Sequence, residues 1–141
     1  MQAVNCFRTC DIRGLYPDEV HEELFFRLGQ TIAFQYLVDT PILAGCDVRL
    51  SSASLKAALT EGLVEAGARV LDAGRLPTPV IYFGRRRLGV GAAAIITASH
   101  NPAEYNGLKL LLGEGPASPE QIAALREGLL VKKISRPGGC R

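Results

Sequence analysis

The chain has 141 residues, 48% of them hydrophobic, and a formal net charge of +2 from 16 basic and 14 acidic side chains. This length suits one globular domain with a core of its own, and the near-neutral charge argues against a nucleic-acid-binding protein. Because charges interrupt the N-terminus and the longest uncharged apolar stretch, residues 88–99, is too short to span a bilayer, we expect a cytoplasmic protein with no nucleic-acid or membrane partner.

The pattern of apolar and turn-forming residues predicts alternating strands and helices. We expect a short strand leading into a loop over 3–14, a helix from 18 to 40, a strand at 42–46, a helix over 51–67, a strand at 69–72, a helix over 78–88, strands at 91–97 and 108–112, and a helix beginning at 118. Ser51, Ser52 and Thr78 are expected N-cap residues, and residues 118–121 have the form of a capping box.

Such alternation predicts an α/β fold, a three-layer α/β/α sandwich with a mixed, mostly parallel sheet. In these sheets function gathers in the loops that follow the strands, here residues 47–52, 74–78 and 97–106. We expect one domain over residues 1–131 and a flexible basic tail over 132–141. The four cysteines lack metal-ligand spacing, which predicts reduced thiols rather than a zinc site.

The most informative stretch is the polar segment Thr97-Ala98-Ser99-His100-Asn101-Pro102, which follows an apolar strand. The proline keeps the preceding asparagine out of helical dihedrals and helps to fix the loop. Ser99 is therefore a hydroxyl on a stiff loop, beside an imidazole. Taken alone, a Ser-His pair is usually a solvated turn, and side chains adjacent in sequence seldom form a hydrolase triad.

Three stretches in the same order resemble motifs of the α-D-phosphohexomutase superfamily, in its phosphomannomutase/phosphoglucomutase branch. They are residues 97–102 with the downstream Asn106-Gly107-Leu108-Lys109, the N-terminal Phe7-Arg8-Thr9-Cys10-Asp11-Ile12-Arg13-Gly14, and Gly45-Cys46-Asp47-Val48-Arg49-Leu50-Ser51-Ser52. The first is similar to the phosphoserine signature of that family. The resemblance covers nearly the whole chain but only the N-terminal domain of the family's four-domain architecture.

The resemblance implies that Ser99 carries a phosphoryl group in the interconversion of hexose 1-phosphate and 6-phosphate. It further implies catalytic roles for Arg13, Lys109 and His100. It implies phosphate or substrate contacts for Asn101, Thr97 and Arg49. Asp47 and Arg49 would also support the residues that form the site. Mg²⁺ would bind the phosphate on Ser99, and hexose 1,6-bisphosphate would be the activator and intermediate. From the residues alone, Arg13 could instead cap a turn or pair with Asp11, and Lys109 could be a solvated strand lysine.

Two positions depart from the family pattern: Cys46 replaces a usual arginine and Cys10 a usual aromatic residue. The family's other metal ligands and its sugar-selecting loop belong to later domains. We therefore expect negligible turnover from this chain alone, with the missing domains and a hexose phosphate as its partners. The alternative is a non-catalytic phosphate- or partner-binding module; nucleic-acid binding through residues 85–87 and 132–133 is a weaker possibility at this net charge.

Overall fold

Helices and strands alternate along the described chain. The computed structural model describes residues 6–130. Its elements are, in chain order, β1 (Ile12–Leu15), α1 (Glu22–Tyr36), β2 (Ile42–Cys46), α2 (Ser52–Glu65), β3 (Val70–Arg75), α3 (Thr78–Leu88), β4 (Ala92–Ile96), β5 (Tyr105–Leu112), β6 (Gly115–Pro116) and α4 (Pro119–Leu130). No helix within this part is long and apolar enough to cross a membrane. The expected tail, residues 132–141, lies outside the described residues, so the division at residue 131 stays a prediction.

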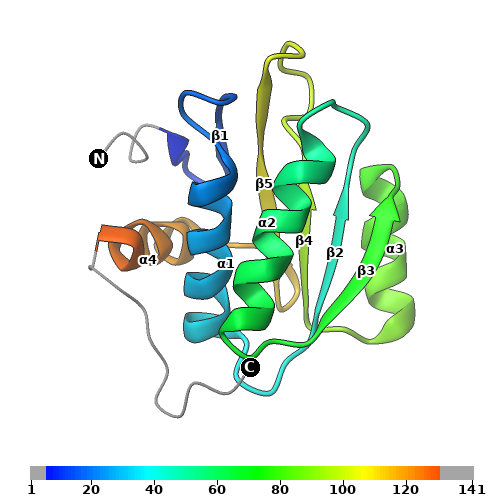
Figure 1. Ribbon diagram of the computed structural model, residues 1–141. Helices are drawn as coiled ribbons and strands as arrows, with labels where there is room; N and C mark the ends of the chain where they lie inside the picture. Colours follow the sequence, from blue (N-terminus) through cyan, green and yellow to red (C-terminus); the bar gives the residue numbers. More distant parts are fainter. Residues whose placement is uncertain (1–5, 131–141) are drawn as a thin grey trace.

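One mixed sheet contains the strands, in the order β1-β5-β4-β2-β3 with β6 beside β5 (Figure 1). The pairs β2–β3 and β2–β4 are parallel, whereas β5 is antiparallel to β1, β4 and β6. Among the described strands, β5 therefore runs against the direction of the others. The predicted sandwich with a mixed, mostly parallel sheet is confirmed; the two-residue β6 was not predicted.

Helices cover both faces of the sheet and bury its apolar side chains. On one face α1, α2 and α4 enclose a large core that includes Leu28, Leu59 and Leu125. On the other face α3 packs against β2 and β4 through Ile81. Figure 1 shows α3 toward the β3 side of the sheet, away from β1. The second face is thus covered unevenly, with the β1 end of the sheet outside the reach of α3.

The N-terminal prediction is wrong where it extends the loop to residue 14, because Ile12–Leu15 form β1; residues 3–5, where the predicted strand starts, lie outside the described residues. Among the described residues the loop comes first: Arg8 N–H donates to Asp11 O at 2.8 Å, which closes a tight turn. Phe7 makes only a single bridge to Ile12, where β1 begins. The turn over residues 8–11 cannot continue an extended strand, so the chain reverses before it enters the sheet.

Helix α1 begins at Glu22 rather than at Asp18, because the residues before it form a turn. Leu15 O accepts from Glu19 N–H at 2.8 Å, and the Glu19 carboxylate accepts from Leu15 N–H at 2.8 Å. His21 is the N-cap residue, and its Nδ1 accepts from a backbone N–H of the first turn at 3.2 Å. The His21 side chain therefore caps the first turn of the helix.

The predicted helix caps have mixed outcomes. Ser51 occupies the N-cap position of α2 but makes no capping hydrogen bond there, and Pro77, rather than Thr78, is the N-cap residue of α3. The capping box of α4 is confirmed. Gln121 N–H donates to Ser118 Oγ at 3.1 Å, and Ser118 N–H donates to the Gln121 side chain at 2.8 Å.

Candidate active site on the serine loop

The serine loop, defined as residues 97–102, follows β4 at the sheet edge where the parallel strands end. Thr97 Oγ1 accepts from Ser99 N–H at 3.1 Å, which tightens the turn around the serine. Ser99 has a φ of 53°, in the left-handed region that strains a residue with a Cβ. Ser99 and His100 are exposed. The loop therefore exposes the serine to solvent on a strained backbone that a hydrogen bond from within the loop stabilises.

The strand register places Arg13 and Lys109 on one face of the sheet. Arg13 on β1 lies opposite Gly107 on β5, and Lys109, two residues further on, lies opposite Ile95. Ile95 packs in the core on the α3 side, and side chains two apart in a strand share a face. The two predicted catalytic cations therefore point to the α3 side of the sheet. Gly107 permits this pairing, since a Cβ there would lie 2.0 Å from Ile12 O.

Arg13 connects β1 to the serine loop. Its Nη1 donates to Asn101 Oδ1 at 3.0 Å, and its Nη2 forms an ion pair with Asp11. The arginine side chain is 27% exposed. A guanidinium has five N–H groups, so these contacts leave donors that can meet a phosphate. Arg13 thus pairs with Asp11 and also contacts the serine loop through Asn101, and its catalytic role stays a prediction.

Arg49 has a different environment. Its guanidinium donates to five oxygens: Asp47 Oδ2 at 3.2 Å, Pro102 O at 2.7 Å, Tyr105 O at 3.2 Å, Ser99 O at 2.8 Å and Asn101 O at 2.9 Å. Five acceptors use all five N–H groups of an arginine. In this conformation Arg49 has no donor left for a phosphate, so the geometry does not support its expected phosphate contact. It supports the expectation that Arg49 supports the residues that form the site, here through the backbone of the serine loop.

Lys109 and His100 have unused polar atoms. Within residues 6–130, neither side chain makes a hydrogen bond or an ion pair. Lys109 is half-buried on β5. His100 is exposed next to Ser99. Both are available to a bound molecule, and their catalytic roles stay predictions.

Two further residues, Asn106 and Ser52, are connected to the site by the fold, although no role there was expected for them from the sequence. Asn106 is fully buried and donates to the Ser51 and Ser52 hydroxyls at 2.7 and 3.0 Å. Ser52, also fully buried, donates to Asp47 Oδ1. Asn106 and Ser52 lie within recognised motifs, but only their burial in the fold distinguishes them from loop-forming polar residues.

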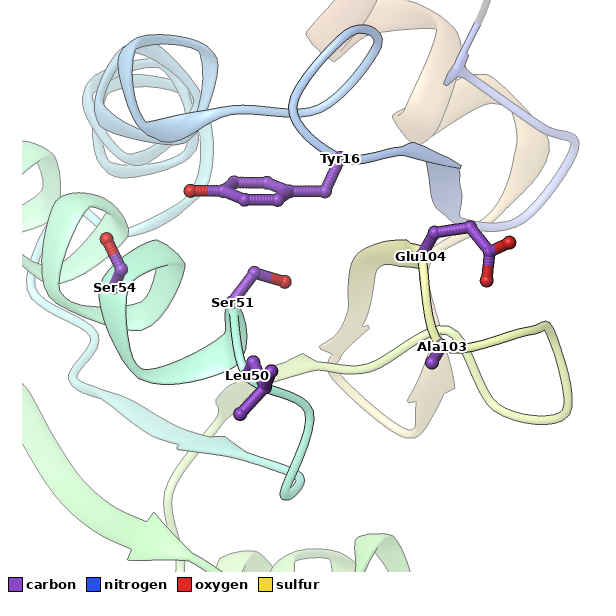
Figure 2. A pocket seen from close by; sticks show the side chains of 6 residues that line it. All are labelled: Tyr16, Leu50, Ser51, Ser54, Ala103 and Glu104. Carbon is purple, nitrogen blue, oxygen red and sulfur yellow. The ribbon is translucent and has the colours of Figure 1, made fainter.

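A cavity of about 330 Å³ opens beside the serine loop. It is lined by Tyr16, Leu50, Ser51, Ser54, Ala103 and Glu104, which come from the turn after β1, the start of α2 and the segment after the serine loop (Figure 2). None of the seven predicted site residues lines it. The cavity is therefore a neighbour of the candidate site and does not coincide with it.

The described residues do not by themselves form a magnesium site. Within residues 6–130 no three His, Cys, Asp or Glu side chains gather in a group that could hold a metal ion. Two carboxylates of the neighbouring motifs are already bound, Asp11 by Arg13 and Asp47 by Arg49.

The cysteines near the site differ in exposure. Cys6, Cys10 and Cys46 are thiols rather than disulfides. Burial raises the pKa of Cys6 to about 11 and also raises the pKa of Cys46, so both stay neutral at pH 7. Cys10 is exposed because it lies on the turn before β1. Cys46, which stands where the family usually has an arginine, is thus a small neutral side chain at the end of β2.

The fold and the loop together define a class: an α/β/α domain that presents an exposed serine on the loop after β4, with an arginine on β1 and a lysine on β5. The profile described as "Phosphoglucomutase/phosphomannomutase, alpha/beta/alpha domain I" matches residues 4–133. The chain therefore belongs to the phosphoglucomutase/phosphomannomutase family and corresponds to its domain I.

Individual relatives agree with this assignment. A phosphomannomutase of Escherichia coli is 45% identical over 111 residues, which is 79% of this chain and 24% of that protein. A phosphomannomutase of Klebsiella pneumoniae is 44% identical over 111 residues, 70% of its length. The crystal structure of a phosphoglucomutase/phosphomannomutase family protein from Burkholderia thailandensis superposes with a TM-score of 0.79 at 29% identity, covering 92% of this chain and 30% of that one. The chain thus spans about a quarter of the E. coli relative.

Proposed function

We propose that this domain is the phosphoserine-bearing part of a phosphohexomutase that interconverts hexose 1-phosphate and hexose 6-phosphate. The observation that carries the proposal is the position of Ser99: its hydroxyl is exposed on a strained loop that Asn101 ties to Arg13. Arg13 keeps unused donors, and Lys109 on the same sheet face has no partner in the described residues. A phosphoserine carries about −1.5 to −2 charge at neutral pH, and two cations on one face suit that charge.

The proposed reaction moves one phosphoryl group at a time. The bond between Ser99 Oγ and phosphorus breaks while a free hydroxyl oxygen of the hexose phosphate forms a bond to that phosphorus and loses its proton. The product is hexose 1,6-bisphosphate. After the sugar reorients, its other phosphoryl group returns to Ser99 Oγ, and the sugar oxygen left behind takes up a proton. The net result is a phosphate moved between C1 and C6.

The residues of this domain would act mainly through position and charge. Phosphoryl transfer depends on in-line placement and on neutralising the equatorial oxygens. Arg13 would bind the phosphate with its remaining N–H groups while Asn101 keeps it next to the loop. Lys109 would stabilise the same charge or exchange the sugar's proton, and the exposed His100 would orient the hydroxyl or contact the sugar. Thr97 holds the serine amide and shapes the loop.

The remaining requirements lie beyond this domain. We propose that Mg²⁺ binds the phosphate on Ser99 only in a complete enzyme, because the described residues provide no closed ligand set. Hexose 1,6-bisphosphate would prime that enzyme, and the segments absent from this chain would select the sugar. The domain alone is proposed to lack turnover.

A chimera tests the proposal. Residues 4–133 replace the matching domain of the E. coli phosphomannomutase, which is 45% identical over 111 residues, and turnover of mannose 1-phosphate is measured. Ser99→Ala should abolish turnover, whereas the control Ser54→Ala, at another exposed serine, should keep it. Peptide mass mapping should find the phosphate on Ser99 in the active chimera. A folded chimera that turns over normally with Ser99→Ala would refute the assignment.

A folded but inactive chimera, with no phosphate on Ser99 after incubation with hexose 1,6-bisphosphate, would also count against catalysis. That outcome would favour the non-catalytic binding module.

A further inference from the structure

A continuous chain of hydrogen bonds runs from the sheet interior toward the serine loop. It begins at Asn106, near the start of β5, whose side chain is fully buried. The Asn106 amide nitrogen donates to Ser51 Oγ at 2.7 Å and Ser52 Oγ at 3.0 Å, and its oxygen accepts from Gly107 N–H at 2.8 Å. All polar atoms of this amide are thus engaged, which fixes its orientation in the core.

The chain continues through a serine and a carboxylate to Arg49. Ser52 donates to Asp47 Oδ1, and the same oxygen accepts from Arg49 N–H at 3.1 Å. The other oxygen of Asp47 accepts from Arg49 Nε at 3.2 Å. A carboxylate accepts hydrogen bonds but does not donate them. The bond from Arg49 Nε to Asp47 therefore sets the orientation of the guanidinium plane. The two terminal nitrogens of Arg49 donate to other acceptors.

Those two nitrogens reach the backbone of the serine loop and the residues after it. They bind four carbonyl oxygens, of Ser99, Asn101, Pro102 and Tyr105. Hydrogen bonds from a charged donor are about twice as strong as neutral ones, and four of them converge on seven consecutive residues. They hold a backbone in which Ser99 has a φ of 53°, a conformation that needs its surroundings to maintain it.

We propose that Asn106, Ser52 and Asp47 are positioning residues, which act through Arg49 to hold Ser99 Oγ where phosphoryl transfer requires it. In this assignment the positive charge of Arg49 serves the loop backbone and not the substrate. The forked geometry is what matters, because a lysine ammonium cannot reproduce five donors in one plane. The catalytic part of the inference rests on the proposed function of Ser99; the structural part does not.

The first test measures the loop in the whole 141-residue chain. Asp47→Asn is isosteric, but places an amide NH₂ or a weaker oxygen against Arg49 Nε, so the guanidinium loses its anchor. Amide hydrogen exchange over residues 98–105 should accelerate about tenfold or more, because a charged hydrogen bond is lost. The control Asp72→Asn alters an exposed carboxylate on β3 and should leave that segment unchanged. Unchanged exchange in a folded Asp47→Asn variant would overturn the proposal.

The second test separates positioning from phosphate binding, and uses the E. coli chimera. Arg49→Lys retains the charge but not the fork. A positioning role predicts that kcat falls by about 10²-fold with KM changed little, in both Arg49→Lys and Asp47→Asn. A phosphate contact would instead be rescued by lysine, or would appear as a raised KM, and either result would overturn the inference.

A further variant keeps the test decisive if Asp47→Asn fails to fold. Ser52→Ala removes a single buried hydroxyl and should produce the same exchange pattern with a smaller amplitude. If the wild-type chimera is inactive and Ser99 is never phosphorylated, the proposed function fails, while the exchange experiment still decides whether these residues hold the loop.

Discussion

Gly107 is the position where a single methyl group should separate the two strands that carry the site. An alanine Cβ there would lie 2.0 Å from Ile12 O and 3.0 Å from the Arg13 Cα. Backbone atoms cannot rotate away, so β1 must move off β5. Overpacking of this kind costs about 1–3 kcal/mol, and we expect Gly107→Ala to lower the free energy of unfolding by about 2–3 kcal/mol because the clash is with backbone.

Gly115→Ala is the matched control. A Cβ at Gly115 meets no atom within 4 Å, and its backbone needs no left-handed conformation. This variant should be neutral, or more stable by up to about 1 kcal/mol through a less flexible unfolded chain. Urea titration of both variants with a common slope gives the difference, and in a thermal scan the Gly107→Ala midpoint should fall by roughly 10 °C. Equal stability of Gly107→Ala and Gly115→Ala would refute the argument from close strand approach.

The other predictions concern the cap of α4, the thiols and one surface ion pair. Ser118→Ala should cost about 1 kcal/mol in a urea titration, because it removes the side-chain cap of α4. Iodoacetamide at pH 8, followed by peptide mapping, should label exposed Cys10 well before buried Cys6, whose pKa is about 11; equal rates would contradict the burial. The hydrogen bond from Lys56 lowers the pKa of Asp72. A lowered folded-state pKa stabilises the protein above the unfolded pKa of the aspartate, and this stability is lost as pH falls through the folded value. Lys56→Met should therefore reduce stability at pH 7 more than at pH 2, and a loss of equal size at both pH values would contradict the linkage.

The local sequence pattern was sufficient to predict most helices and strands and to recognise the family. The apolar run of β2 and the capping box of α4 lie where the sequence predicts them, because strand burial and capping depend on a few neighbouring residues. The predictions failed where a local pattern competed with a turn. The chain before α1 uses Glu19 to close a turn with Leu15, and the helix begins only after it.

The sequence by itself determined the chemistry available to this protein: a serine on a stiff loop, with an arginine and a lysine in recognisable motifs. Only the tertiary structure decided which donors of the arginines are already bound within the domain. Arg13 and Arg49 look alike in their motifs, yet Arg49 has all five N–H groups bound and Arg13 does not. The acceptors of Arg49 include carbonyls about 50 residues away in the chain. Whether a donor is used or available depends on which distant backbone the fold brings to it, and spacing along a chain does not contain that information.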